Sequence, residues 1–190
     1  MSDFLPHPFW NFSLEVYGME GVAQACLDLQ DRRGCDVNVL MFCTWMGASG
    51  RGTLSADRLR TILADSDRWQ SAVVRPLRAL RSSLKDGPAT PGVPAEISAA
   101  LRRKVADAEL AAEHAEQLLL AGYHPQLGNR DLPLRERMRA AIGNLAVYAL
   151  CLGIVPDDRD RESVVSLIGA AFPTMIRPEV ERAVGLRAVA

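Results

Sequence analysis

The chain has 190 residues, which is enough for one domain whose hydrophobic core needs neither a metal nor a disulfide. Lysine and arginine together number 22, against 23 for aspartate and glutamate, so no overall charge attracts nucleic acid or an anionic membrane. The composition therefore excludes a strongly basic nucleic-acid-binding protein and favours one compact domain over residues 1–190.

The cysteines and the N-terminus favour a reducing, cytoplasmic environment. Cys26, Cys35, Cys43 and Cys151 lie mostly inside apolar runs and show no Cys-x-x-Cys spacing, which is typical of buried reduced thiols. The N-terminus lacks a basic region followed by a long apolar run, and no window reaches about 18 apolar residues. We therefore expect a cytoplasmic protein with no membrane partner.

Apolar residues recur at helical spacing along nearly the whole chain, which predicts an all-α fold. The first helix is expected over residues 8–18 and the second over residues 20–33, each ending at a glycine. Asp36 can cap a third, apolar helix over residues 37–46. A strand is the alternative at residues 36–39, because polar and apolar residues alternate there.

A long helix is predicted after a glycine-rich turn. Ser55 can cap this helix, and its apolar periodicity continues to about residue 86. Pro76 lies inside the pattern, where it removes one backbone donor and clashes with the preceding turn. We therefore expect a kink or a short break near Arg75.

The second half begins after a proline- and glycine-rich loop at residues 86–95. An alanine-rich helix follows, and it is expected to pair with the next helix, residues 134–152, as a C-terminal αα hairpin. A last helix is predicted over residues 161–171, within a helical half that spans 96–172, and a frayed tail over 179–190. The sequence thus predicts a compact bundle of six to seven helices.

Basic residues share one face of the long helix and form what we call the basic stripe. At 100° per residue they fall within an arc of roughly 140°, opposite the apolar face. The basic stripe consists of Arg68, Arg75, Arg78, Arg81 and Lys85. Because the planar arginine fork suits carboxylate and phosphate, this stripe predicts a surface for an acidic protein or a small anionic ligand. The alternative is a solvated helix face without a binding role.

A pocket between the third and fourth helices is a second candidate site. Asn38, Trp45, Trp69 and Arg75 are expected to converge there around an anionic ligand. The alternative for Asn38 is a purely structural amide that satisfies a helix end. Arginine forks that point outward would favour a partner surface, whereas two or more turned into a cavity would favour an anionic ligand.

The turn over residues 47–53 has the glycines of a phosphate-binding loop, whose backbone amides can contact phosphate oxygens. It lacks the lysine that should precede Thr53, and an apolar helix rather than a strand is expected before it. The turn therefore predicts no nucleotide hydrolysis. A plain turn and a lesser anion contact through Arg51 are the two remaining interpretations.

Metal-binding and nucleophile patterns are missing from the sequence. The histidines lie at positions 7, 114 and 124, so none is four residues from another. No cysteine stands beside a histidine or a clear activating cation. We therefore predict no metal, no cofactor and no catalytic residue.

Several strings in the first half carry a family resemblance. They include FWNFSLEVY at residues 9–17, DVNVL at 36–40 and PLRALR at 76–81. These strings resemble a proteobacterial family of unknown function, the DUF2390 proteins, over about residues 8–86. The resemblance implies a small, soluble, bacterial helical protein, and it supplies no catalytic residues.

The leading hypothesis is a non-enzymatic cytoplasmic protein that binds an acidic or phosphate-bearing partner through the basic stripe, chiefly Arg75, Arg78 and Arg81. The alternative is a small-molecule or cofactor-binding protein, an enzyme included, with an anionic ligand in the pocket of Asn38, Trp45 and Trp69. A homodimer through the alanine-rich hairpin is a third hypothesis, and it predicts a melting temperature that depends on protein concentration.

Overall fold

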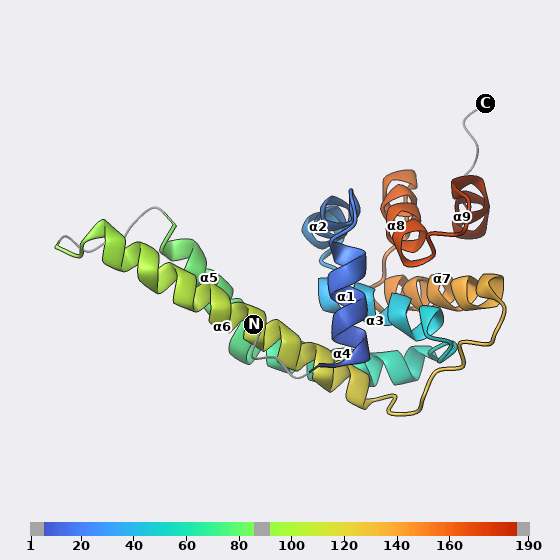
Figure 1. The fold of residues 1–190 in the computed structure, drawn as a ribbon, viewed down its shortest axis with the longest axis horizontal. Helices are drawn as coiled ribbons and strands as arrows, with labels where there is room; N and C mark the ends of the chain where they lie inside the picture. The colour runs from blue at the N-terminus through green and yellow to red at the C-terminus, as the bar shows by residue number, and fades with distance from the viewer. Residues whose placement is uncertain (1–5, 86–91, 186–190) are drawn as a thin grey trace.

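The computed structural model describes residues 6–85 and 92–185, which form nine α-helices and one π-helical turn and contain no strand (Figure 1). The all-α prediction is confirmed, and the helices are more numerous than the predicted six to seven. In chain order the helices are α1 (Pro8–Tyr17), α2 (Val22–Arg33), α3 (Val37–Ala48), α4 (Ala56–Trp69), η1 (Gln70–Val74), α5 (Arg75–Ser83), α6 (Ala95–Gly122), α7 (Leu134–Cys151), α8 (Asp158–Ala171) and α9 (Arg177–Val184).

The helix α3 is the centre of the core, as its apolar sequence predicts. The Asp36 carboxylate accepts hydrogen bonds from the backbone N–H groups of Asn38 and Val39, so this residue caps α3 and the strand alternative is wrong. Phe42 and Trp45 are 0% and 2% exposed. An apolar helix covered on every side is expected only at the middle of a bundle.

The long helix is interrupted, as the position of Pro76 predicts. The chain runs through α4, η1 and α5, and the N–H of Arg75 bonds to the carbonyl of Gln70, five residues earlier. Pro76 cannot donate to the preceding turn and its ring crowds that turn, so a wider π-helical turn accommodates it. The interruption turns Gln70 into the protein interior, where it is 5% exposed.

The predicted αα hairpin of the alanine-rich helix with the next helix is wrong. Instead α6 packs along α4, η1 and α5, and also contacts α1 and α3, while α7 packs against α3. Figure 1 shows α5 lying beside the first half of α6, away from the other helices. Charge supports the pairing of α5 with α6, because arginines of α5 face glutamates of α6. The homodimer stays a prediction.

The remaining helices close the other side of the core. α7 approaches α3 closely at Gly47, where a Cβ atom would lie 2.1 Å from the backbone nitrogen of Ala141. α8 packs on α2, and α9 packs on α8. The helix α9 was not predicted; it occupies part of the tail that was expected to fray, whereas residues 86–91 of the predicted loop and 186–190 of the tail lie outside the described residues.

Ion pairs fix α8 against α2 in what we call the α2–α8 ion cluster, formed by Arg32, Arg33, Asp157 and Asp160. Asp157 and Asp160 form a capping box at the start of α8. Asp160 is 3% exposed and accepts hydrogen bonds from Arg32 Nη1 at 3.0 Å and Arg33 Nε at 3.1 Å. Separately, none of the helices described has the length and apolar character needed to cross a membrane.

Candidate functional site

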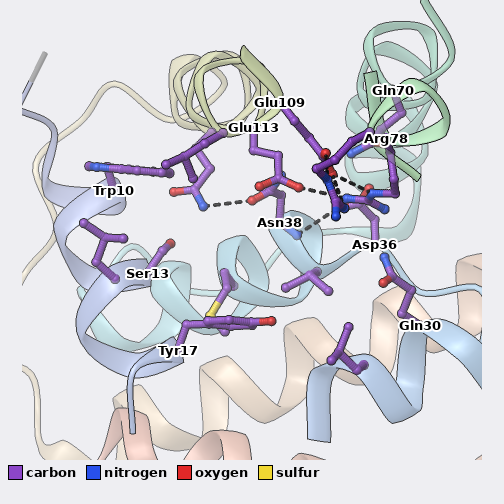
Figure 2. A pocket seen from close by; sticks show the side chains of 17 residues that line it. Trp10, Ser13, Tyr17, Gln30, Asp36, Asn38, Gln70, Arg78, Glu109 and Glu113 are labelled. Carbon is purple, nitrogen blue, oxygen red and sulfur yellow. Dashed lines mark hydrogen bonds and ion pairs between the residues drawn. The ribbon is translucent and has the colours of Figure 1, made fainter. Parts of the chain in front are cut away.

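A cavity of about 470 Å³ opens between α1, α2, α3, α5 and α6. Figure 2 shows Trp10, Ser13 and Tyr17 of α1 on one side of it and Arg78 of α5 on the other. The volume falls in the range of small-molecule sites, roughly 300–1,000 Å³. The cavity also combines aromatic walls with a few polar groups, which is typical of such sites.

Glu116 lies behind this cavity and is fully buried at 0% exposure. Its carboxylate accepts hydrogen bonds from Ser66 Oγ at 2.6 Å, Gln70 Nε2 at 2.7 Å and Asn38 Nδ2 at 2.8 Å. Burial, together with the negative charge of Asp36, raises the pKa of Glu116 to about 7 in spite of these donors. A pKa in this range means that the carboxyl group of Glu116 titrates near neutral pH.

The Glu116 contacts fix the orientation of two amide side chains. Asn38 must direct its Nδ2 group at the carboxylate, so its Oδ1 faces Gln117 and accepts a hydrogen bond from Gln117 Nε2 at 2.8 Å. The remaining polar atom of Gln117, the acceptor Oε1, is buried without a hydrogen-bond partner in the described chain. Gln117 is 4% exposed and is one of the residues that line the cavity, so the network leaves a buried, unpaired acceptor next to the cavity.

Ser13 supplies a second polar group to the cavity, from the α1 side. Its side chain is buried, and its Oγ makes no hydrogen bond to the residues that the structure describes. Buried polar groups nearly always have a partner, so each exception calls for an explanation. Ser13 and Gln117 line the same cavity from α1 and α6.

The arginines of the cavity are already paired with glutamates. Arg78 Nε lies 3.0 Å from Glu109 Oε1, Arg78 Nη2 lies 2.8 Å from Glu113 Oε1, and Arg81 also bonds to Glu109. Burial raises the pKa of Glu109, but the hydrogen bonds from Arg81 and Arg78 outweigh it and hold this pKa below its usual value. Burial keeps the pKa of Glu113 above its usual value, although Arg78 opposes the shift.

Asp36 is a cavity carboxylate without a paired cation. Its Oδ1 caps α3 at 2.8 Å from the Asn38 nitrogen, and its backbone N–H donates to Tyr148 Oη at 2.8 Å. It forms no ion pair with the described residues, although the charges of Arg78 and Arg75 act on it from farther away. Burial raises the pKa of Asp36, although the capping hydrogen bonds act in the opposite direction. Three carboxylates thus face two guanidinium groups in the cavity lining.

The basic stripe divides between the cavity and the surface. Arg78 and Arg81 line the cavity, whereas Arg68 pairs with Asp65 on the surface of α4. The remaining members are exposed: Arg75, which pairs with Asp67 at 2.7 Å, and Lys85. A partner surface on this stripe stays a prediction, and the turning of two arginines into a cavity favours the small-molecule alternative.

The residues predicted to form a pocket do not converge. Asn38 lines the cavity, but Trp45 lies in the core with its ring 5.0 Å from that of Phe9. Trp69 donates its Nε1–H to the carbonyl of Ala112 at 2.9 Å, and Arg75 points away to Asp67. The cavity therefore lies against α1 and α6, whose contribution the sequence reasoning missed.

One sequence pattern could have indicated some of the cavity residues that were not predicted. Glu109, Glu113 and Glu116 follow one another at spacings of four and three, so they share a face of α6. The spacing of Arg78 and Arg81 matches this acidic row across the contact with α5. Ser13 and Gln117 carry no comparable signal, because a serine or a glutamine on a helix is normally solvated.

The cysteines are poor candidates for nucleophilic chemistry. Burial raises the pKa of Cys26 to about 12 and that of Cys35 to about 11, so both thiols are protonated at neutral pH. Within residues 6–85 and 92–185, no three histidine, cysteine, aspartate or glutamate side chains are grouped so that they could hold a metal ion.

Comparison with known proteins gives a family match. A family model with the description "Protein of unknown function (DUF2390)" matches residues 8–120, which is more than half of the chain. The matched segment contains every residue that lines the cavity. No curated protein and no solved structure matches the chain.

Proposed function

Since the chain belongs to the DUF2390 family, whose description names no activity, we propose its function from the cavity alone: the protein binds a small organic cation. The observation that carries this proposal is the Oε1 atom of Gln117, an acceptor without a partner in the described chain, from a side chain that lines the cavity. A buried acceptor left unpaired costs about 1–3 kcal/mol. A ligand N–H group would recover that energy once a small movement of the Gln117 side chain exposes this buried atom to the cavity.

The charges around the cavity favour a cation over an anion. Arg78 and Arg81 are occupied by Glu109 and Glu113, so an anionic ligand would have to displace these carboxylates. Asp36 offers a carboxylate that no described cation pairs with. An ammonium group beside Asp36 would gain a charge-assisted hydrogen bond without breaking an existing one. The anionic ligand predicted from the sequence is therefore the weaker proposal.

The aromatic side of the cavity supports the same ligand class. Trp10 and Tyr17 line the cavity from α1, and the Trp10 ring contacts His114 edge-on at a centroid distance of 4.7 Å. A cation over the face of a tryptophan or tyrosine ring is stabilised by about 0.5–2 kcal/mol. Leu14 and Leu27 also line the cavity and are 56% and 40% exposed, so an apolar ligand body would find contacts.

The test compares three probes of similar size: 2-phenylethylammonium, phenylacetamide and phenylacetate. Each is titrated into the full chain while the Gln117 side-chain amide and the Trp10 indole are followed by NMR. We expect the ammonium probe to shift both signals in a saturable way, and phenylacetate to bind most weakly. Loss of the carboxylate in Asp36→Asn should weaken ammonium binding about tenfold, while asparagine still caps α3.

The matched control is Asp31→Asn, which removes an exposed carboxylate on α2 outside the cavity. The control should bind the ammonium probe as the unsubstituted protein does. Equal weakening in the two variants would mean that only the overall charge matters. That result, tighter binding of phenylacetate, or no saturable binding of the ammonium probe would overturn the proposal.

A further inference from the structure

The turn after α3 meets the α6–α7 connection (Figure 1). Several arginine side chains belong to this junction. The Asn129 N–H donates to the Gly50 carbonyl at 3.1 Å, and a Cβ atom on Gly50 would lie 1.9 Å from the carbonyl oxygen of Asn129. Gly128 is equally restricted, because its Cβ would lie 1.9 Å from the Ser49 carbonyl oxygen. The close approach of the two backbones therefore explains why positions 50 and 128 are glycines.

The turn is not a phosphate-binding loop of the backbone type. The amides of its first half are already used, because the N–H of Gly50 donates to the Gly47 carbonyl and the N–H of Arg51 to the Met46 carbonyl, each at 2.9 Å. An anion at this turn would therefore be held mainly by side chains. Arg51 is the side chain of the turn that can supply it.

The Arg51 guanidinium is held in place but has no acceptor. Its central carbon lies 3.9 Å from the ring centroid of Trp45, which is buried. No described carboxylate or carbonyl accepts a hydrogen bond from it, and its Nε atom is buried. A half-buried arginine with no acceptor is unfavourable unless something outside the chain supplies one.

Neighbouring cations at the junction are also without carboxylates. Arg58 lies over the ring of Tyr123 at 5.1 Å and donates to the Tyr123 carbonyl at 3.0 Å. Arg137 donates to the Ala48 carbonyl at 2.8 Å. Neither Arg58 nor Arg137 forms an ion pair within the described part of the chain. Burial and then the charges of Arg58 and Arg51 lower the pKa of His124, so both guanidinium groups act on this imidazole.

We infer that this junction binds a phosphate-type oxyanion, with Arg51 and Arg58 as its two forks. Each guanidinium group lies over an aromatic ring, and a guanidinium fork can give two parallel hydrogen bonds to phosphate. Arg137 adds positive charge beside them. The inference is independent of the cavity, because none of these arginines lines it.

The test uses inorganic pyrophosphate as the probe, titrated into the full chain by calorimetry at constant ionic strength. We expect saturable binding with one site per chain. Loss of one fork in Arg51→Gln or Arg58→Gln should weaken binding about tenfold or more, and Arg51→Lys should give an intermediate loss because it keeps the charge without the planar fork. The control is Arg139→Gln, which removes an exposed arginine of α7 that forms no ion pair with the residues the structure describes.

Two results would overturn the inference: pyrophosphate binding that does not saturate, or equal weakening in Arg139→Gln and Arg51→Gln. The melting temperature of each variant without ligand shows whether it is folded, and Arg51→Lys serves as the fork test if Arg51→Gln is not. Asp36→Asn should leave pyrophosphate binding unchanged. The cavity proposal and this one can therefore fail separately.

Discussion

Two polar clusters join distant parts of the chain: the network around Glu116 and the α2–α8 ion cluster. They differ in how deeply they are buried. The network around Glu116 is closed off from water and links α3, α4, η1 and α6 through neutral side chains. The α2–α8 ion cluster is partly exposed: the Arg32 side chain is 26% and that of Asp157 46% accessible. The buried network therefore disfavours the negative charge of Glu116, whereas the ion cluster surrounds Asp157 and Asp160 with arginines that favour their negative charge.

The difference gives the two contacts opposite dependence on pH. The Asp160 backbone N–H, followed by Arg32 and Arg33, lowers the pKa of Asp157 to about 2. That contribution to stability is present above the ordinary aspartate pKa of about 4 and is lost as the pH falls towards 2. The raised pKa of Glu116 works in reverse, because the folded state loses stability as the pH rises from about 4.5 to 7.

The largest effect is expected from removing the Glu116 carboxyl group. Glu116→Leu leaves the donors of Ser66, Gln70 and Asn38 buried without an acceptor, which should lower the free energy of unfolding by about 3–5 kcal/mol. Glu116→Gln is the matched control, because its Oε1 can accept from Asn38 and Gln70 while its Nε2 donates to the Ser66 hydroxyl. Urea unfolding measures both, and a loss below about 1 kcal/mol in Glu116→Leu contradicts the network.

The pH dependence should give the next largest effect. Between about pH 4.5 and 8, the protonation of Glu116 should change the free energy of unfolding by about 3 kcal/mol, with the protein less stable at the higher pH. Because the side chain in Glu116→Gln cannot titrate, the contribution of Glu116 is obtained by comparing two curves. These are the free energy of unfolding against pH for the unsubstituted protein and for Glu116→Gln. Profiles that run parallel over this range would mean that Glu116 is ionised throughout.

The α2–α8 ion cluster should respond more weakly to loss of Asp160. Asp160→Ala removes one half of the capping box and the acceptor for Arg32 and Arg33, and we expect a loss of about 2 kcal/mol in the free energy of unfolding. Asp158→Ala in the same helical turn is the control, since Asp158 is exposed. Equal losses in these variants would show that helix-terminal charge, not the cluster, is responsible.

The sequence predicted the features that depend on neighbours along the chain. Asp36 caps α3 and Pro76 adjoins the break because each acts within one helical turn. The partner of α6 could not be predicted in this way, since alanine spacing shows a close approach but not which helix approaches. Glu116 was missed for a related reason: a glutamate on a charged helix is normally solvated, and only the fold brings Asn38, Ser66 and Gln70 around it.

The smallest effect is expected in the exposed part of the basic stripe. Arg75 and Asp67 are 58% and 65% accessible, so Arg75→Gln should change the free energy of unfolding by less than about 0.5 kcal/mol. Arg78→Gln should cost more, because it leaves the buried Glu109 with one cation instead of two. Unfolding of both variants by urea ranks the two positions. If Arg75→Gln lowers the free energy of unfolding more than Arg78→Gln does, the exposed Arg75–Asp67 pair stabilises the fold more than its accessibility suggests. Arg75 would then have a structural role and would be a weaker candidate for binding a partner.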